Sequence, residues 1–126
     1  MADKKKILIV DDEAALRRAL SDSLTALNEF EILEAGDGEA ALEIIRKEHP
    51  DLVLLDIAMP KMDGIEVARR MQSEKLLDAT KVMFLTNSTD ITQIATAVEV
   101  GSADYLIKAD WDIQDILRRV LEKVRV

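Results

Sequence analysis

The segment LVLLD, residues 52–56, decides the fold expected for this chain. Four apolar residues in a row are typical of a short strand that is covered on both faces, as in a parallel sheet. A carboxylate, Asp56, follows the run directly, at the point where such a strand ends. Because ligands of open parallel sheets bind outside the carboxyl ends of the strands, the segment predicts both a sheet and a place for chemistry.

Similar apolar runs alternate with segments of helical period along the whole chain. The expected strands are residues 7–10, 31–35, 52–55, 82–85 and 105–107, and the expected helices are residues 15–27, 39–47, 65–72, 91–100 and 113–124. This alternation predicts an α/β fold: a flavodoxin-like, doubly wound (βα)5 parallel sheet of five strands in the order 2-1-3-4-5, with helices on both faces. Glu31 and Glu34 lie in the second run and suit an edge strand.

Four positions carry more local expectations. Arg17 should face solvent, and Leu27 should join the buried stripe of the first helix. Gly101 should cap the end of the fourth helix, and Asp112 should cap the start of the fifth.

The composition limits the range of functions. A chain of 126 residues with 48% hydrophobic residues predicts one domain with one real core. The absence of cysteine excludes a disulfide framework, a zinc-thiolate site and a redox dithiol, and it fits a cytoplasmic location. No apolar run approaches the roughly 18–20 residues that span a bilayer, so no membrane partner is expected. The net charge of -8 argues against nucleic-acid binding by this domain alone.

Charged or polar residues follow four of the five expected strands. Asp11 and Asp12 follow the first strand, Asp56 the third, Thr86 the fourth and Lys108 the fifth. With the strand order 2-1-3-4-5, the three carboxylates should converge where the order reverses, and at least one pKa should rise through mutual repulsion. Such a cluster needs a cation, and magnesium, or manganese in its place, suits an all-oxygen site that also takes a phosphate.

A carboxylate flanked by a metal, an ammonium and a hydroxyl is equipped to become an aspartyl phosphate. Taken singly, each residue also has an ordinary structural explanation. Asp12 or Glu13 suits a helix N-cap, Thr86 a turn and Lys108 a solvated loop. The complete set, with each member at a strand end, favours a functional site.

The residues that carry this pattern resemble the receiver domains of bacterial response regulators in two-component systems, over essentially the full length. The resemblance rests on ILIVDDE (residues 7–13), AAL (40–42), PDLVLLDIAMPKMDG (50–64), FLT (84–86) and GSADYLIK (101–108). It implies one receiver domain over residues 1–126, similar to the single-domain chemotaxis regulators. Such a domain is a phosphorylation-dependent signalling switch and turns over no separate substrate.

The resemblance also implies roles for individual residues. Asp56 is similar to the phosphoacceptor, and Asp12 to a direct metal ligand beside it. Asp11 is similar to a residue that acts mainly through a metal-bound water, and the backbone carbonyl of Ala58 to the third protein ligand of the metal.

Three further residues are similar to the parts of the family's switch. Lys108 matches the lysine that pairs with the acceptor carboxylate and then with the phosphoryl group. Thr86 matches the hydroxyl that moves to bond the phosphoryl oxygen, and Tyr105 matches the aromatic that turns inward behind it.

The implied phosphoryl donor is a sensor histidine kinase, a phosphotransfer protein or a small phosphodonor. An unknown downstream protein would bind the face made by the fourth helix, fifth strand and fifth helix, with the chain a monomer or a weak phosphorylation-dependent dimer. The identity of the kinase and of the output, the phosphoryl lifetime, and whether the chain stands alone or belongs to a longer protein stay open.

The sequence departs from the family pattern at two positions of the site. Ala109 stands after Lys108, where the family has a proline that follows a cis bond. Because a cis bond to a non-proline residue costs about 2.5–4 kcal/mol, we expect a trans bond here. Asn87 follows Thr86, where the family prefers a very small residue, and it should crowd the approach of a phosphoryl group.

Three other functions fit parts of the pattern. A haloacid dehalogenase-type phosphatase has an Asp-x-Asp spacing after the first strand and a cap domain, whereas this chain has adjacent Asp11 and Asp12 and no room for a cap. A flavin carrier needs a phosphate loop rich in Ser, Thr and Gly, where this chain is acidic. A receiver that only docks to partners is the third, and intact Asp56, Thr86 and Lys108 argue against it.

Overall fold

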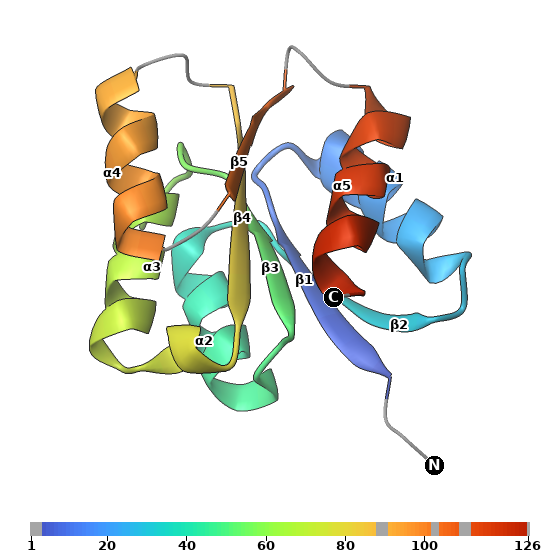
Figure 1. The fold of residues 1–126 in the computed structure, drawn as a ribbon, viewed down its shortest axis with the longest axis horizontal. Helices are drawn as coiled ribbons and strands as arrows, with labels where there is room; N and C mark the ends of the chain where they lie inside the picture. The colour runs from blue at the N-terminus through green and yellow to red at the C-terminus, as the bar shows by residue number, and fades with distance from the viewer. Residues whose placement is uncertain (1–3, 88–90, 102–103, 109–111, 126) are drawn as a thin grey trace.

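Five parallel strands form the centre of the molecule (Figure 1). The computed structural model describes residues 4–87, 91–101, 104–108 and 112–125. The strands are β1 (Lys5–Val10), β2 (Phe30–Ala35), β3 (Leu52–Leu55), β4 (Lys81–Thr86) and β5 (Asp104–Ile107), and they lie in the order β2-β1-β3-β4-β5. The predicted flavodoxin-like fold is therefore confirmed, and residues 31–35 belong to an edge strand as expected.

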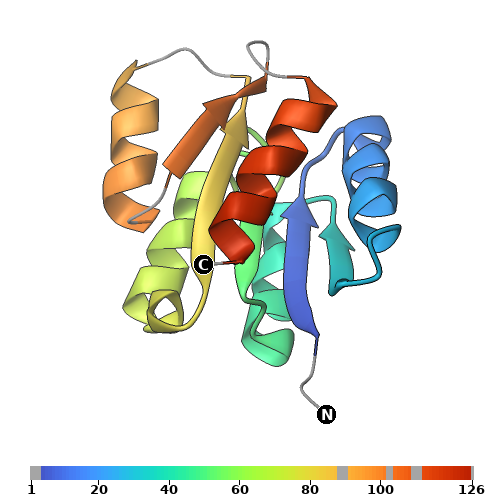
Figure 2. The ribbon, with the colours of Figure 1, turned by 45° about the vertical axis from the view of Figure 1, so that its right-hand side comes forward.

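Helices cover both faces of this sheet (Figures 1 and 2). They are α1 (Ala14–Thr25), α2 (Gly38–Glu48), α3 (Gly64–Ser73), α4 (Ile91–Gly101) and α5 (Ile113–Val124), with a short 3-10 helix, η1 (Leu76–Asp78), which the sequence pattern did not indicate. The buried residues of α2, α3 and α4 share one core with one face of the sheet. Those of α1 and α5 share a second core with the other face.

The apolar runs are continuous because the sheet is buried on both sides. In β3, Val53 and Leu55 belong to the core under α2, α3 and α4, while Leu52 and Leu54 belong to the core under α1 and α5. All four side chains are at most 1% exposed. The segment that predicted a parallel sheet therefore lies at its centre, between β1 and β4.

The local expectations had mixed outcomes. Asp112 caps α5 as predicted, since its side chain accepts a hydrogen bond from the backbone N–H of Asp115 at 2.9 Å. The prediction for Leu27 was wrong, because α1 ends at Thr25 and Leu27 is 42% exposed in the turn that follows. Gly101 is the last residue of α4 itself rather than a residue beyond its end.

The loop between β3 and α3 holds the start of α3 directly against the end of β3. The backbone N–H of Gly64 donates to the carbonyl of Ile57 at 2.8 Å, and the side chain of Asp63 caps the helix by accepting from the N–H of Glu66. A Cβ atom at position 64 would overlap the backbone carbonyl oxygen of Asp56. Glycine is therefore required here by a close backbone approach, immediately beside the candidate site.

Replacing Gly64 by alanine should destabilise the fold by about 1–3 kcal/mol, because two backbone segments would have to separate. Gly36→Ala is the matched control, since a Cβ there would meet only side-chain atoms of Arg17, the nearest at 3.3 Å, and no backbone. Urea denaturation of both variants measures the difference. Equal losses for the two variants would contradict the close approach described for Gly64.

Candidate functional site

Three carboxylates meet at the carboxyl ends of β1 and β3. Asp11, Asp12 and Asp56 each offer an oxygen, and these oxygens lie within 4.8 Å of one another. Asp56 stays in register with β1 because its N–H donates to the carbonyl of Val10 at 3.0 Å. Asp11 and Asp56 are only 2% and 4% exposed, whereas Asp12 is exposed. The expected convergence of the three carboxylates is confirmed.

Hydrogen bonds from three directions fix the backbone and side chain of Asp11. Its N–H donates to the carbonyl of Ala35 in β2 at 3.1 Å, and its side chain accepts from the N–H of Glu13 at 2.8 Å. Arg17 reaches back from α1 to donate to the Asp11 carbonyl at 2.6 Å and to Glu34 at 3.1 Å. The expectation that Arg17 faces solvent was therefore wrong, because unpaired acceptors in the β1–α1 loop and on β2 draw it inward.

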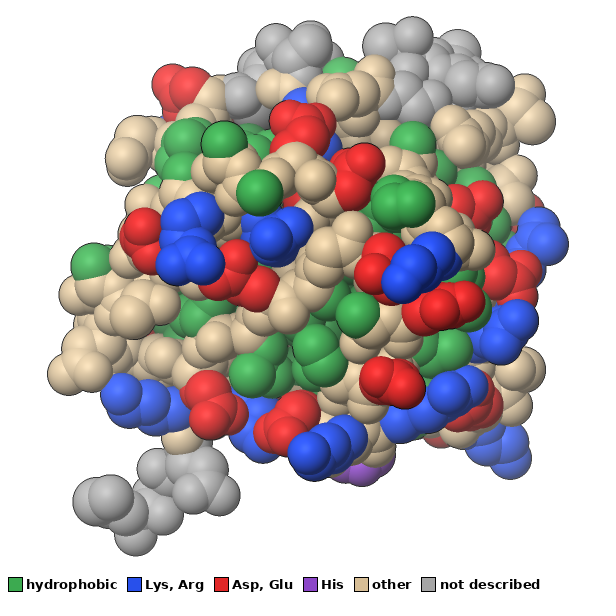
Figure 3. Space-filling view, turned by 180° about the vertical axis from the view of Figure 1, so that it is seen from behind, with side chains coloured by type: hydrophobic (Ala, Val, Ile, Leu, Met, Phe, Trp, Pro, Cys, Tyr) green, Lys and Arg blue, Asp and Glu red, His purple; other side chains and the backbone are tan. Residues whose placement is uncertain are grey.

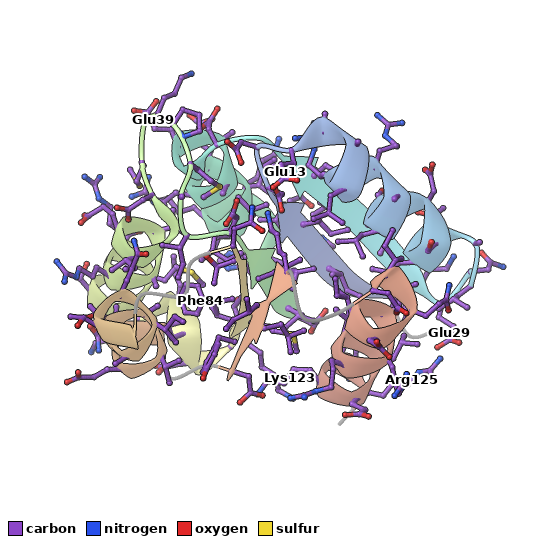
Figure 4. All side chains as sticks on the ribbon, turned by 90° about the horizontal axis from the view of Figure 1, so that it is seen from above. Glu13, Glu29, Glu39, Phe84, Lys123 and Arg125 are labelled. Carbon is purple, nitrogen blue, oxygen red and sulfur yellow. The ribbon has the colours of Figure 1, made fainter. Side chains whose placement is uncertain are left out.

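Lys108 brings a positive charge to the carboxylates from the end of β5. Its side chain is 7% exposed, and its Nζ lies 2.7 Å from Asp11 Oδ2, 3.1 Å from Glu13 Oε1 and 3.3 Å from Asp56 Oδ2. An ammonium has three hydrogens, so each of them has a carboxylate acceptor. The alternative of a solvated loop lysine does not hold. Figure 4 shows these strand ends from above, with Glu13 labelled close to the start of α1.

Burial and neighbouring charges shift the pKa values of Asp56, Lys108 and Glu13. Burial raises the pKa of Asp56 from its ordinary value of 3.8 to about 6; Lys108 opposes the shift, and Asp11 and Asp12 add to it. Burial alone would lower the pKa of Lys108, but the hydrogen bond to Asp11 and the charge of Asp56 outweigh it and raise that pKa. The hydrogen bond from Lys108 lowers the pKa of Glu13.

The remaining predicted residues, Thr86, Tyr105 and Ala58, differ in how deeply they are buried. Thr86 is buried at the end of β4, beside Ile107 of β5. Tyr105 lies in β5 next to Phe84 and is 44% exposed. Ala58 is exposed, two residues beyond Asp56. The bond between residues 108 and 109, expected to be trans, lies outside the described residues.

Glu13 is the participant that reasoning from the sequence missed. It stands at the N-cap position of α1, as one explanation held, but its side chain makes no capping hydrogen bond. The carboxylate instead accepts from Lys108 Nζ at 3.1 Å and from Asn87 Nδ2 at 3.2 Å. No local pattern could have indicated these contacts, because Asn87 and Lys108 lie 74 and 95 residues further along the chain.

The carboxylates fit a divalent metal ion. Carboxylate oxygens are the ligands that magnesium prefers, and the exposed Asp12 leaves one side of the cluster open to water, which magnesium retains in its shell. Burial, with smaller contributions from Asp11 and Asp12, outweighs the opposing effect of Lys108 and keeps the pKa of Asp56 raised. A second cation would therefore be favourable at this place.

A sequence profile of the response regulator receiver domain matches residues 7–121. The chain belongs to this family. Receiver domains of this family serve signal transduction in two-component systems and bind magnesium at a cluster of aspartates. Among the described helices, none is long and apolar enough to cross a membrane.

Curated relatives of this receiver domain are longer proteins. The probable transcriptional regulator ycf27 of Porphyridium aerugineum is 37% identical over 96% of this chain and 50% of its own length. The response regulator MprA of Mycolicibacterium vanbaalenii is 34% identical over 95% of this chain and 50% of its own length. The chain thus spans about half the length of the curated relatives it matches.

Solved receiver domains match this chain over nearly its entire length. A signal receiver domain assigned to the response regulator NarL from Mycobacterium tuberculosis has a TM-score of 0.86 and 31% identity, with 98% of each chain covered. The BeF3-activated DrrB receiver domain has a TM-score of 0.83 and 26% identity, with 98% of this chain and 100% of that one covered.

The raised pKa of Asp56 should make wild-type stability depend on pH. In metal-free buffer the folded state binds the additional proton between about pH 4 and 6, so its stability falls as pH rises through that window. Asp56→Asn has no carboxyl group at this position, so its stability should not fall for this reason. Relative to wild type, the variant should therefore gain about 1–3 kcal/mol between pH 4.5 and pH 7.

Urea denaturation in EDTA at the two pH values measures this gain. Asp22→Asn, at an exposed position of α1, is the control and should show none. An Asp56→Asn protein whose difference from wild type is the same at both pH values would show that Asp56 titrates as an ordinary aspartate.

Proposed function

We propose that the chain is a phosphorylation-controlled switch whose phosphoacceptor is Asp56. The observation that carries the proposal is the buried Asp56 carboxylate at the end of β3, 3.3 Å from the ammonium of Lys108 and beside two further carboxylates. Asp11, Asp12, Asp56 and the backbone carbonyl of Ala58 would hold magnesium, or manganese in its place. The metal would supply positive charge for the oxygens of the phosphoryl group.

The reaction is a transfer of one phosphoryl group. An oxygen of the Asp56 carboxylate forms a bond to phosphorus, and the bond from phosphorus to the leaving group of the donor breaks, with its electron pair going to that leaving group. The donor is a sensor histidine kinase, a phosphotransfer protein or a small acyl phosphate. Lys108 neutralises part of the charge that gathers on the transferring group.

The product carries a dianion at the end of β3, which is a strong new hydrogen-bond acceptor. In this proposal the hydroxyl of Thr86, at the neighbouring strand end, moves to donate to it, and Tyr105 turns inward from its exposed position. The change would alter the face made by α4, β5 and α5, where an unknown downstream protein binds. The chain would act in the cytoplasm as a monomer, or as a weak dimer when phosphorylated.

We do not propose nucleic acid as a partner of this domain alone. The net charge is -8, and on the face shown in Figure 3 basic side chains are interspersed with acidic ones. Several of the basic residues are paired, such as Arg46 with Glu74 at 2.6 Å and Arg70 with Glu66 at 3.1 Å. Among the described residues on that face there is no continuous positive stripe for a phosphate backbone.

Incubation with acetyl phosphate and magnesium should add one phosphoryl group to the wild-type protein, seen by intact mass spectrometry. Asp56→Asn and the addition of EDTA should each abolish the adduct. Asp78→Asn, which removes an exposed carboxylate of η1, should leave the adduct unchanged. An adduct that persists in Asp56→Asn would move the acceptor elsewhere, and a wild type that stays unmodified would favour a receiver that only docks.

A further inference from the structure

All three hydrogens of the Lys108 ammonium already have carboxylate acceptors. During phosphoryl transfer Asp56 is still present as the nucleophile, so the incoming group finds no free hydrogen on Lys108. One of the three carboxylates must give way before the ammonium can bond a phosphoryl oxygen. Which one gives way follows from burial.

Asp11 cannot readily leave Lys108, because it is buried and its other oxygen accepts from the N–H of Glu13. The side chain of Glu13, in contrast, is 51% exposed and can turn into water. Its second hydrogen-bond partner is the side-chain amide of Asn87, which is also exposed. Glu13 is therefore the acceptor that costs least to displace.

The contacts of Glu13 also join two loops across the site. Glu13 is the last residue of the β1–α1 connection, and Asn87 directly follows Thr86 at the end of β4. Because the carboxylate does not cap α1, its position is explained by Lys108 and Asn87 rather than by the helix. While Glu13 is in place, its carboxylate links Asn87, the residue next to Thr86, to the ammonium of Lys108, which also contacts Asp56.

We propose that Glu13 is a competing carboxylate that occupies Lys108 in the unphosphorylated protein and slows phosphorylation of Asp56. This inference rests on the function proposed above. Glu13 acts in two ways: it takes an ammonium hydrogen that the phosphoryl group needs, and its negative charge repels the anionic donor. Its departure from Lys108 also releases Asn87 next to Thr86, so that entry of the phosphoryl group is coupled to Asn87 at the end of β4.

Glu13→Gln keeps the shape of the side chain and removes its charge. At saturating magnesium, the rate of adduct formation from acetyl phosphate should rise about two- to fivefold, the factor expected for one partly exposed ion pair. Glu39→Gln, at an exposed position in the first turn of α2, is the matched control and should leave the rate unchanged. Because the effect is electrostatic, the ratio of the Glu13→Gln and wild-type rates should fall as salt is added.

A second pair of variants tests the connection through Asn87. Asn87→Ala loosens Glu13 and should raise the rate less than Glu13→Gln does. In the Glu13→Gln background the same substitution should have no further effect. An equal acceleration in both backgrounds would show that Asn87 acts by crowding the donor, and it would overturn the connection.

The outcomes for Glu13 separate this inference from the proposed function. A wild type that acquires the adduct on Asp56 while Glu13→Gln reacts at the same rate, or more slowly, would overturn the competing role alone. A wild type that acquires no adduct would overturn the proposed function, and the inference with it. A faster Glu13→Gln whose advantage does not change with salt would also overturn the inference, since added salt screens and weakens repulsion between charges.

Discussion

The structure depends on how the charge of two buried carboxylates is compensated. The sheet places Asp11 and Asp56 side by side at the ends of adjacent strands, where each is less than 5% exposed. A buried charge without a partner is strongly destabilising. Lys108 supplies that partner from the far edge strand, β5, and so ties the edge of the sheet to its centre.

The positive charge of Lys108 compensates only part of the negative charge at this site. One ammonium faces the carboxylates of Asp11, Glu13 and Asp56, and Asp12 lies close by. Burial and the nearby carboxylates raise the pKa of Asp56 to about 6 in spite of Lys108. A site of this kind favours added positive charge, such as that of a metal ion.

Much of this arrangement could be predicted because it follows from local sequence patterns, namely apolar runs and the residues directly after them. The run at residues 52–55 predicted a strand covered on both faces, and parallel strands bring their carboxyl ends to one edge, so Asp11 and Asp56 had to meet. Contacts between distant side chains could not be predicted in this way. Arg17 belongs to the first helix and Glu13 to its cap, yet their positions are set by Glu34 on β2 and by donors directly after β4 and β5.

The central claim concerns the charge at Asp56, and a carbon-13 NMR titration of its carboxyl group tests it most directly. In EDTA the midpoint should lie near 6, and saturating magnesium should move it well below that value because the metal stabilises the carboxylate. A midpoint near the ordinary 3.8 in EDTA, unchanged by magnesium, would contradict both the uncompensated cluster and the metal site.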